Sequence, residues 1–140
     1  MLANRLFLDS SFIIALSSEN DELHERALDV AGELDVRNSS IVTTGAVLLE
    51  VGNAMSRKNY RKAATKLLDA IQSDARVEII PLTDSLFSDA FDLYKARNDK
   101  EWGLTDCASF VVMKDHGLIQ ALTADKHFKQ AGFEPVLLND

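Results

Sequence analysis

Four acidic residues occur in this sequence in a pattern that could place them around one metal ion: Asp9, Glu50, Asp106 and Asp125. Asp9 and Asp125 follow short apolar segments, Asp106 opens one, and Glu50 lies within another. Carboxylates without a histidine or cysteine form a hard, oxygen-only ligand set, which suits Mg²⁺ or Mn²⁺ and disfavours zinc. The four acids therefore predict a metal-binding carboxylate cluster.

Each acid, taken singly, also has a structural interpretation. Asp9 and Asp125 fit turns, and Asp106 fits the first turn of a helix, where free N–H groups favour a negative charge. Glu50 fits a solvated helix position less well, because its neighbours are apolar and an unpaired buried carboxylate is costly. A divalent cation would compensate that cost.

The elements that would position these acids alternate along the chain. We expect short apolar strands at residues 5–8, 40–43, 77–81, 119–123 and 135–138. We expect helices at residues 12–16, 21–34, 46–57, 60–72, 84–96, 106–116 and 125–132. The expected capping residues are Ser10, Ser11, Thr43 or Thr44, Thr83 and Thr105.

This alternation predicts an α/β fold: one domain over residues 1–140, with an open parallel sheet of four to five strands and helices on both faces. Ligands bind such sheets beyond the carboxyl ends of the strands. Asp9 and Asp125 are expected at that edge, Asp106 opens the helix that leads into the fourth strand, and Glu50 lies about two turns into the helix after the second. The fold thus predicts that the four acids meet.

Composition narrows the class of protein. The chain has 46% hydrophobic and 26% charged residues, as in globular proteins, and no apolar run approaches the roughly 20 residues that a membrane helix needs. No secretory signal is visible, and a single cysteine, Cys107, fits a reducing compartment, so a cytoplasmic protein is expected. The net charge of −7 argues against a nucleic-acid partner unless a metal neutralises the acids locally.

Four motifs give the sequence a family resemblance. They are Asp9-Ser10-Ser11, Leu49-Glu50-Val51-Gly52-Asn53-Ala54, Leu104-Thr105-Asp106-Cys107 and Thr123-Ala124-Asp125-Lys126-His127-Phe128. In this order they resemble the PIN-domain nucleases, and among these the single-domain VapC-type toxins of bacterial toxin–antitoxin pairs. The similarity covers essentially the whole chain.

The resemblance implies an endoribonuclease that hydrolyses RNA phosphodiester bonds with Mg²⁺ or Mn²⁺. Asp9 and Asp106 would be the principal ligands, with Asp125 completing the site directly or through water. Glu50 would be either a ligand or the group that orients the attacking water. A small antitoxin protein and a homodimer, formed through the apolar faces of the first two helices, are the implied partners.

The resemblance also implies hydroxyl support from Ser11 for the first acid and from Thr105 near the third. Asp99 is either an accessory acid or, as we prefer, a solvated loop residue beside Lys100. For Trp102 we prefer packing over the core to stacking on a base.

Positive residues that could hold RNA gather after the second acid. The expected contacts are Arg57, Lys58, Arg61, Lys62 and Lys66, with Lys126 beside the fourth acid. An ordinary solvated helix junction explains the first five equally well. His127 has two further interpretations, a phosphate contact or a general acid, beside that of a surface histidine.

Two other classes of function compete with the nuclease. One is a catalytically weak PIN-fold module that binds RNA or protein; the intact acid set argues against it. The other is a phosphotransfer or phosphatase domain of similar sheet topology. Such domains carry paired acids or Asp-x-Asp after the first strand, whereas this chain has Asp9-Ser10-Ser11.

Overall fold

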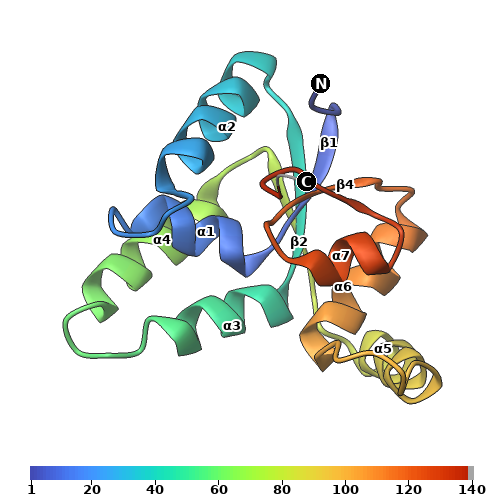
Figure 1. Cartoon of the computed structure of the whole chain (residues 1–140). Coiled ribbons are helices and arrows are strands. Elements are labelled where there is room, and N and C mark those ends of the chain that lie inside the picture. Colours follow the sequence, from blue (N-terminus) through green and yellow to red (C-terminus); the bar gives the residue numbers. More distant parts are fainter. Residues whose placement is uncertain (139–140) are drawn as a thin grey trace.

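A five-stranded parallel sheet forms the centre of the computed structural model, which describes residues 1–138 (Figure 1). Its strands are β1 (Arg5–Leu8), β2 (Ser40–Thr44), β3 (Val77–Ile80), β4 (Gln120–Leu122) and β5 (Glu134–Pro135). The order across the sheet is β3-β2-β1-β4-β5, so β1 lies in the middle. Phe7 of β1 is aligned with Val42 of β2 on one side and with Ala121 of β4 on the other. The predicted open parallel sheet is confirmed.

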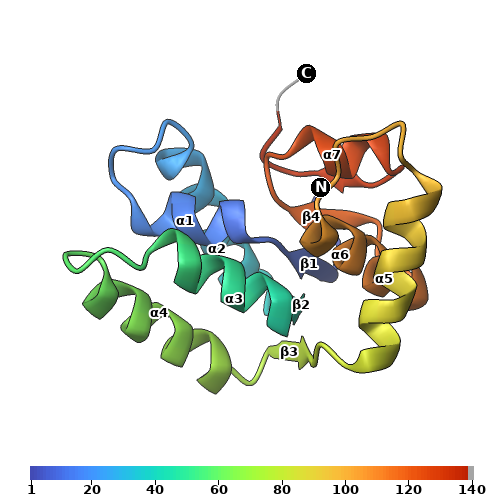
Figure 2. The same cartoon turned by 90° about the horizontal axis from the view of Figure 1, so that it is seen from below.

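Seven helices of the described chain cover both faces of this sheet (Figure 2). They are α1 (Ser10–Ser17), α2 (His24–Arg37), α3 (Gly45–Ala54), α4 (Arg61–Ser73), α5 (Asp84–Ala96), α6 (Leu104–Asp115) and α7 (Lys126–Gln130). The first four lie on one face and the last three on the other. Because parallel crossovers are right-handed, the helices change face where the strand order reverses, between β3 and β4.

That reversal creates a switch point between β1 and β4. The chain leaves β1 toward one edge of the sheet and leaves β4 toward the other, so the two following loops diverge. Ligands bind open α/β sheets in the crevice at such a point. Asp9 directly follows β1 and Asp125 follows β4, so both acids lie at the place that the topology favours.

The core lies between the sheet and its helices. Apart from its first residue, β1 is buried, and β4 is buried throughout, because helices cover both faces of a parallel sheet. On the α5–α7 side, Phe110 of α6 makes edge-on contacts with Trp102 and Phe128, each at 5.0 Å between ring centroids. These aromatic contacts fix α6 and α7 against each other, and both helices begin beside the acids.

The apolar side chains of α5 are only partly buried. Leu86 and Ala90 are buried, whereas Phe87, Phe91 and Tyr94 are 48%, 40% and 45% exposed. The reason is that α5 packs mainly on α6, so the faces of α5 turned away from α6 stay exposed. On α3, Leu49 is likewise exposed.

Several predicted boundaries were wrong by a few residues. The helix predicted at 12–16 already begins at Ser10, so Ser10 and Ser11 lie within it and do not cap it. The helix predicted from residue 21 begins at His24, and the one predicted to reach residue 57 ends at Ala54. The last strand is Glu134–Pro135, shorter than predicted at 135–138.

The helix that carries Asp106 begins earlier than its sequence suggests. Its N-cap is Gly103 and not Thr105, which lies inside the first turn. Asp106 accepts a hydrogen bond from the Gly103 N–H (Oδ2 to N, 3.1 Å) and so satisfies the N-cap amide itself. By contrast, Thr44 and Thr83 are the N-caps of α3 and α5, as predicted.

No helix among residues 1–138 is long and apolar enough to cross a membrane. The predicted domain, residues 1–140, extends two residues beyond the described chain.

Candidate active site

Asp9 is the buried acid of the site, with only 4% of its surface exposed. It lies at the end of β1, and two hydroxyl groups point at its Oδ2: Thr123 donates at 2.7 Å and Ser11 at 3.2 Å. Thr123 is itself fully buried and also accepts the Asp125 N–H (Oγ1 to N, 3.1 Å). One threonine therefore links the acid that follows β1 to the acid that follows β4.

Burial dominates the electrostatics of Asp9. It raises the pKa of this carboxyl to about 6, although hydrogen bonds from the Thr123 hydroxyl and the Ser10 backbone act in the opposite direction. The negative charges of Asp106 and Glu50 raise the pKa further. The carboxylate is therefore desolvated and surrounded by like charge, which is the environment that a bound cation would relieve.

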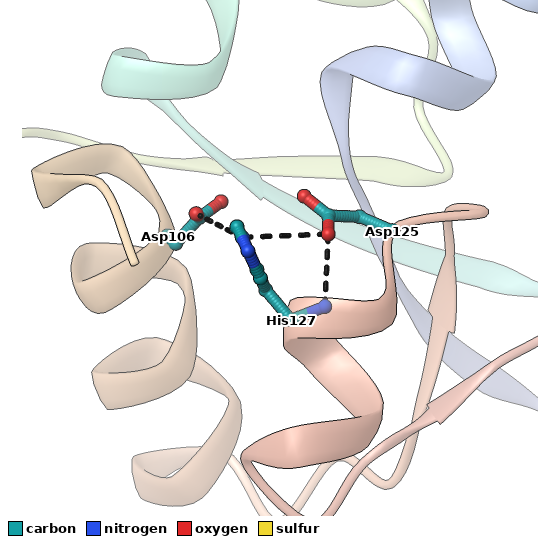
Figure 3. Close-up of side chains that lie close together, drawn as sticks. All are labelled: Asp106, Asp125 and His127. Carbon is teal, nitrogen blue, oxygen red and sulfur yellow. Dashed lines mark hydrogen bonds and ion pairs between the residues drawn. The ribbon is translucent and has the colours of Figure 1, made fainter. Parts of the chain in front are cut away.

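Asp106 and Asp125 face each other across His127 (Figure 3). His127 Nδ1 lies 3.2 Å from Asp106 Oδ2 and 3.4 Å from Asp125 Oδ1. The Asp125 Oδ1 also accepts the His127 N–H at 2.8 Å and so caps α7. One ligand atom from each of the three residues lies within 4.8 Å of the others.

Burial also raises the pKa of Asp106, and the charge of Asp125 adds to the effect. The Gly103 N–H and His127 oppose it. A partly buried carboxylate beside a second carboxylate lies in a density of negative charge that favours a divalent ion.

Glu50 reaches the site from α3, because Ser10 donates a hydrogen bond to its Oε1. This contact joins α1 to the middle of α3. The predicted placement of Glu50 near the sheet edge agrees with it, and with the Coulombic influence of Glu50 on Asp9. The side chain is half-buried, so it is neither a core residue nor fully solvated.

The donor set fits a divalent cation. Four carboxylates from separate parts of the chain converge on one edge of the sheet, and two of them surround an imidazole nitrogen. The sequence predicted oxygen ligands alone, whereas the folded chain adds this nitrogen. Carboxylate oxygens suit both Mg²⁺ and Mn²⁺, and an imidazole nitrogen beside them is compatible with a divalent transition metal.

Comparison with known proteins agrees with this geometry. The model of the PIN domain family matches residues 6–134. The chain belongs to the PIN domain family. Its predicted resemblance to PIN-domain nucleases of the VapC type is thereby confirmed, together with the fold that it implied.

One relative is similar along its whole length. The 23S rRNA-specific endonuclease VapC20 of Mycobacterium tuberculosis is 28% identical over 131 residues, which cover 94% of this chain and 97% of VapC20. The crystal structure of VapC20, described as a Sarcin-Ricin loop cleaving toxin, matches with a TM-score of 0.79 and 27% identity. That match covers 91% of this PIN domain and 95% of the VapC20 chain.

Two further structures share the fold at lower identity. VapBC2 from Rickettsia felis, bound to a DNA fragment from their promoter, has a TM-score of 0.65 at 16% identity, over 94% of this chain and 96% of the matched one. FitAcB from Neisseria gonorrhoeae has a TM-score of 0.65 at 16% identity, over 96% of both chains. At this identity the likeness concerns the PIN fold alone.

Of the two hydroxyl groups expected to support the acids, only that of Ser11 contacts an acid of the described chain. Ser11 contacts Asp9, as described above. The Thr105 side chain makes no hydrogen bond to the acids within residues 1–138, because Thr105 lies in the first turn of α6 and is not its cap. Sequence reasoning also missed the contact of Ser10 with Glu50. It gave no role to Thr123, although a threonine two residues before Asp125 is visible in the motif.

The predicted RNA-binding residues are all exposed, but they lie in two places. Arg57 and Lys58 lie in the turn between α3 and α4, and Arg61 and Lys62 begin α4. In Figures 1 and 2 this turn lies at the end of the helical layer that is remote from α6 and α7. Lys126, in contrast, directly follows Asp125 at the start of α7.

The loop before α6 holds no further acid of the site. Arg97 pairs with Asp99 through two hydrogen bonds, of 2.9 and 3.1 Å, and this pair is exposed. Trp102 is buried and donates its Nε1–H to Gln130 Oε1 (3.0 Å), so it packs over the core as expected. Cys107 is a buried core residue in α6.

Proposed function

We propose that this PIN domain is a metal-dependent endoribonuclease of the VapC type, which hydrolyses RNA phosphodiester bonds. One observation carries the proposal: Asp9, Glu50, Asp106 and Asp125, from four separate segments, converge at the switch point between β1 and β4. VapC20 aligns over almost the whole chain and is named as an endonuclease, which supports the same activity for this protein. Family membership favours the nuclease over a phosphotransfer or phosphatase domain.

The acids would hold Mg²⁺ or Mn²⁺, with Asp9 and Asp106 as the principal ligands and Asp125 completing the site directly or through water. A cation held there would supply Lewis-acid activation of the attacking water and would neutralise charge on the phosphate. Ser11 and Thr123 fix the rotamer of Asp9, and Ser10 holds Glu50 at the rim. Glu50, half-exposed and next to the other acids, is placed to accept a proton from the attacking water.

RNA would be held by exposed cations on two sides of the acids. Lys126 lies next to Asp125 and can contact the phosphate close to the cleaved bond. Arg57, Lys58, Arg61 and Lys62 would contact the backbone farther along, on a path that follows α3 past Glu50. Two separate positive sites suit a substrate several nucleotides long.

As a VapC-type toxin, the protein would bind a small antitoxin. An apolar cleft of about 240 Å³ between α1, α2 and α4 offers a surface for an apolar segment of such a partner. Its half-buried lining includes Leu16 of α1, Ala31 of α2 and Leu67 and Ile71 of α4. Basic Arg76 lies at its rim with Asp35 and Asp74.

A homodimer would use a different surface from the one the sequence suggested. The apolar residues of α1 and α2, such as Phe12, Ile13 and Ala27, are buried within the chain. The exposed aromatic row of Phe87, Phe91 and Tyr94 on α5 is the better candidate. Sedimentation of the wild type and of Phe91→Ser tests this proposal, and an unchanged dimer in the variant contradicts it.

The activity is tested by incubating the purified protein with a labelled RNA pool that contains 23S rRNA. Parallel reactions contain EDTA, EDTA followed by excess Mg²⁺, EDTA followed by excess Mn²⁺, and single-stranded DNA in place of RNA. We expect internal cleavage of RNA, loss of cleavage in EDTA and recovery with metal. Cleavage that persists unchanged in EDTA overturns the metal dependence, and no cleavage with either metal overturns the nuclease.

The toxin role needs a separate test in cells. Induced expression of the protein is expected to arrest growth, and co-expression of a small protein encoded beside it is expected to restore growth. A strain expressing Asp106→Asn is the control, because a folded but inactive protein must not arrest growth. Continued growth during wild-type expression, with RNA cleavage intact in vitro, contradicts the toxin role alone.

A further inference from the structure

The imidazole of His127 is aimed into the site and not away from it (Figure 3). Its Nδ1 is 3.2 Å from Asp106 Oδ2 and 3.4 Å from Asp125 Oδ1, so it lies between the two carboxylates. The side chain of His127 is 22% exposed, whereas the preceding residue, Lys126, is an exposed residue. The sequence alone did not distinguish an inward histidine from a surface one.

The backbone holds the atoms around this nitrogen in place. Asp106 Oδ2 accepts the Gly103 N–H at the start of α6, and Asp125 Oδ1 accepts the His127 N–H at the start of α7. Phe110 of α6 and Phe128 of α7 pack edge-on, which fixes the two helices relative to each other. The two carboxylate oxygens are therefore held by the backbone independently of their contact with the imidazole.

The spacing of these atoms matches that of neighbouring ligands on one ion. For ligand distances of about 2.1 Å in octahedral geometry, adjacent ligand atoms are separated by about 3.0 Å. The two N···O separations, 3.2 and 3.4 Å, are close to this value, and all three atoms lie within 4.8 Å of one another. Small rotations of the side chains would bring them into ligand positions.

We propose that His127 Nδ1 is a direct ligand of the same cation as Asp106 and Asp125, and that it makes the site prefer Mn²⁺ to Mg²⁺. This inference rests on the metal site of the proposed function and adds a ligand to it. Mg²⁺ binds oxygen and keeps several waters, whereas imidazole nitrogen is a ligand for transition metals. The nitrogen therefore strengthens Mn²⁺ binding more than Mg²⁺ binding.

Electron spin-echo spectroscopy of bound Mn²⁺ tests the ligand directly, without an activity measurement. Mn²⁺ is added to the wild type, to His127→Gln and to His116→Gln. His116 is a half-buried histidine at the end of α6, opposite to Asp106, and serves as the matched control. Wild-type protein labelled with ¹⁵N-histidine is measured as well, so one arm of the test is independent of any substitution.

We expect nitrogen modulation in the wild type and in His116→Gln, a change to the ¹⁵N pattern in labelled protein, and loss of the modulation in His127→Gln. Bound Mn²⁺ without nitrogen modulation, or with modulation that His127→Gln retains, overturns the inference. In that case RNA cleavage that still requires metal leaves the proposed function intact. Failure of the wild type to bind Mn²⁺ and Mg²⁺ at all overturns both.

Calorimetric titration measures the metal preference. We expect His127→Gln to bind Mn²⁺ at least tenfold more weakly than the wild type, with a smaller loss for Mg²⁺, while His116→Gln binds both metals like the wild type. Equal losses for the two metals overturn the preference. Far-UV circular dichroism of each variant establishes that α7 is retained.

Discussion

Asp9 combines deep burial with a negative charge that nothing in residues 1–138 neutralises directly. Its neighbours are the hydroxyls of Thr123 and Ser11 and the like charges of Asp106 and Glu50. Hydrogen bonds from hydroxyls orient a carboxylate but do not cancel its desolvation. The free protein is therefore strained electrostatically at this residue, which is a property that metal binding would use.

The raised pKa of Asp9 predicts how pH affects stability. Its folded-state pKa of about 6 lies above the ordinary value of 3.8, so between these pH values the folded protein binds more protons than the unfolded chain. The contribution of Asp9 to the unfolding free energy therefore falls as pH rises through this window, and the penalty is complete above about pH 6. At pH 7.5 without metal it approaches about 3 kcal/mol.

Asp9→Asn removes this charge and nearly preserves the shape. In EDTA, we expect the variant to gain stability over the wild type between pH 4 and pH 7.5, by up to about 3 kcal/mol. Urea unfolding at both pH values measures the difference, and excess Mn²⁺ should narrow it, because metal binding relieves the charge of Asp9 in the wild type and stabilises it more than the variant. A difference that does not vary with pH contradicts the account of Asp9.

Thr123 positions two acids and contacts neither substrate nor metal in this account. Thr123→Val keeps the volume but removes the donor to Asp9 and the acceptor for the Asp125 N–H. We expect a stability loss of about 1–3 kcal/mol and at least a tenfold lower cleavage rate. Thr123→Ser should recover most of both. Equal cleavage by the valine and serine variants would show that the hydroxyl is not needed.

At the scale of the elements, helix starts bring the acids together. Asp106 lies in the first turn of α6, Asp125 caps α7, and Asp9 occupies the N-cap position of α1. Glu50 is the exception, because it lies in the middle of α3 and reaches the site through Ser10. A shift of α3 along its helix axis would therefore move Glu50 relative to the other acids.

Substitution of two N-cap threonines distinguishes an effect on the position of α3 from an effect on overall stability. Thr44 caps α3 through the Val47 N–H, and Thr83 caps α5 through the Leu86 N–H, both at 3.1 Å. Each Thr→Ala substitution should cost about 1 kcal/mol in thermal or urea unfolding. Only Thr44→Ala should also slow RNA cleavage, because α3 carries Glu50. Equal cleavage rates in the two variants would contradict the dependence on α3.

Sequence patterns identified most of these elements but not their contacts. The alternation of strands and helices, the acids at the strand ends and the Thr83 cap follow from local rules, and the structure agrees with them. The exposed Phe87 and Leu49 could not be foreseen, because burial depends on which helix a face meets. The same holds for His127, whose inward orientation depends on how α6 and α7 pack together.

Over the whole molecule, negative charge and RNA binding are compatible because the charges are segregated. The chain carries a net charge of −7, yet four of its 22 acidic residues gather at the site, and its densest basic run lies at the turn between α3 and α4. A cation at the acids would lower the repulsion toward a phosphate, and the basic run would add attraction. RNA would then span the molecule along α3.

Reversing the charge of the basic run between α3 and α4 should weaken RNA binding without changing the cleavage step. In an Asp106→Asn background, we expect Arg61→Glu with Lys62→Glu to reduce RNA affinity and to make its salt dependence shallower, by about 0.7 in logarithmic slope for each phosphate that is no longer neutralised. Lys114→Glu, an exposed lysine in the last turn of α6, is the control. Filter binding at several salt concentrations measures both quantities. An unchanged salt dependence in the double variant would place the RNA elsewhere.

The central claim is that the converging acids perform metal-dependent cleavage of RNA. Single-turnover cleavage of labelled RNA by wild type, Asp106→Asn and Asp99→Asn tests it most directly, since Asp99 is an exposed acid on the neighbouring loop that pairs only with Arg97 among the described residues. With Mg²⁺ or Mn²⁺ present, we predict at least a hundredfold lower rate for Asp106→Asn and an almost unchanged rate for Asp99→Asn, the first amounting to about 2.7 kcal/mol of lost transition-state stabilisation. Equal rates for wild type and Asp106→Asn would contradict the claim.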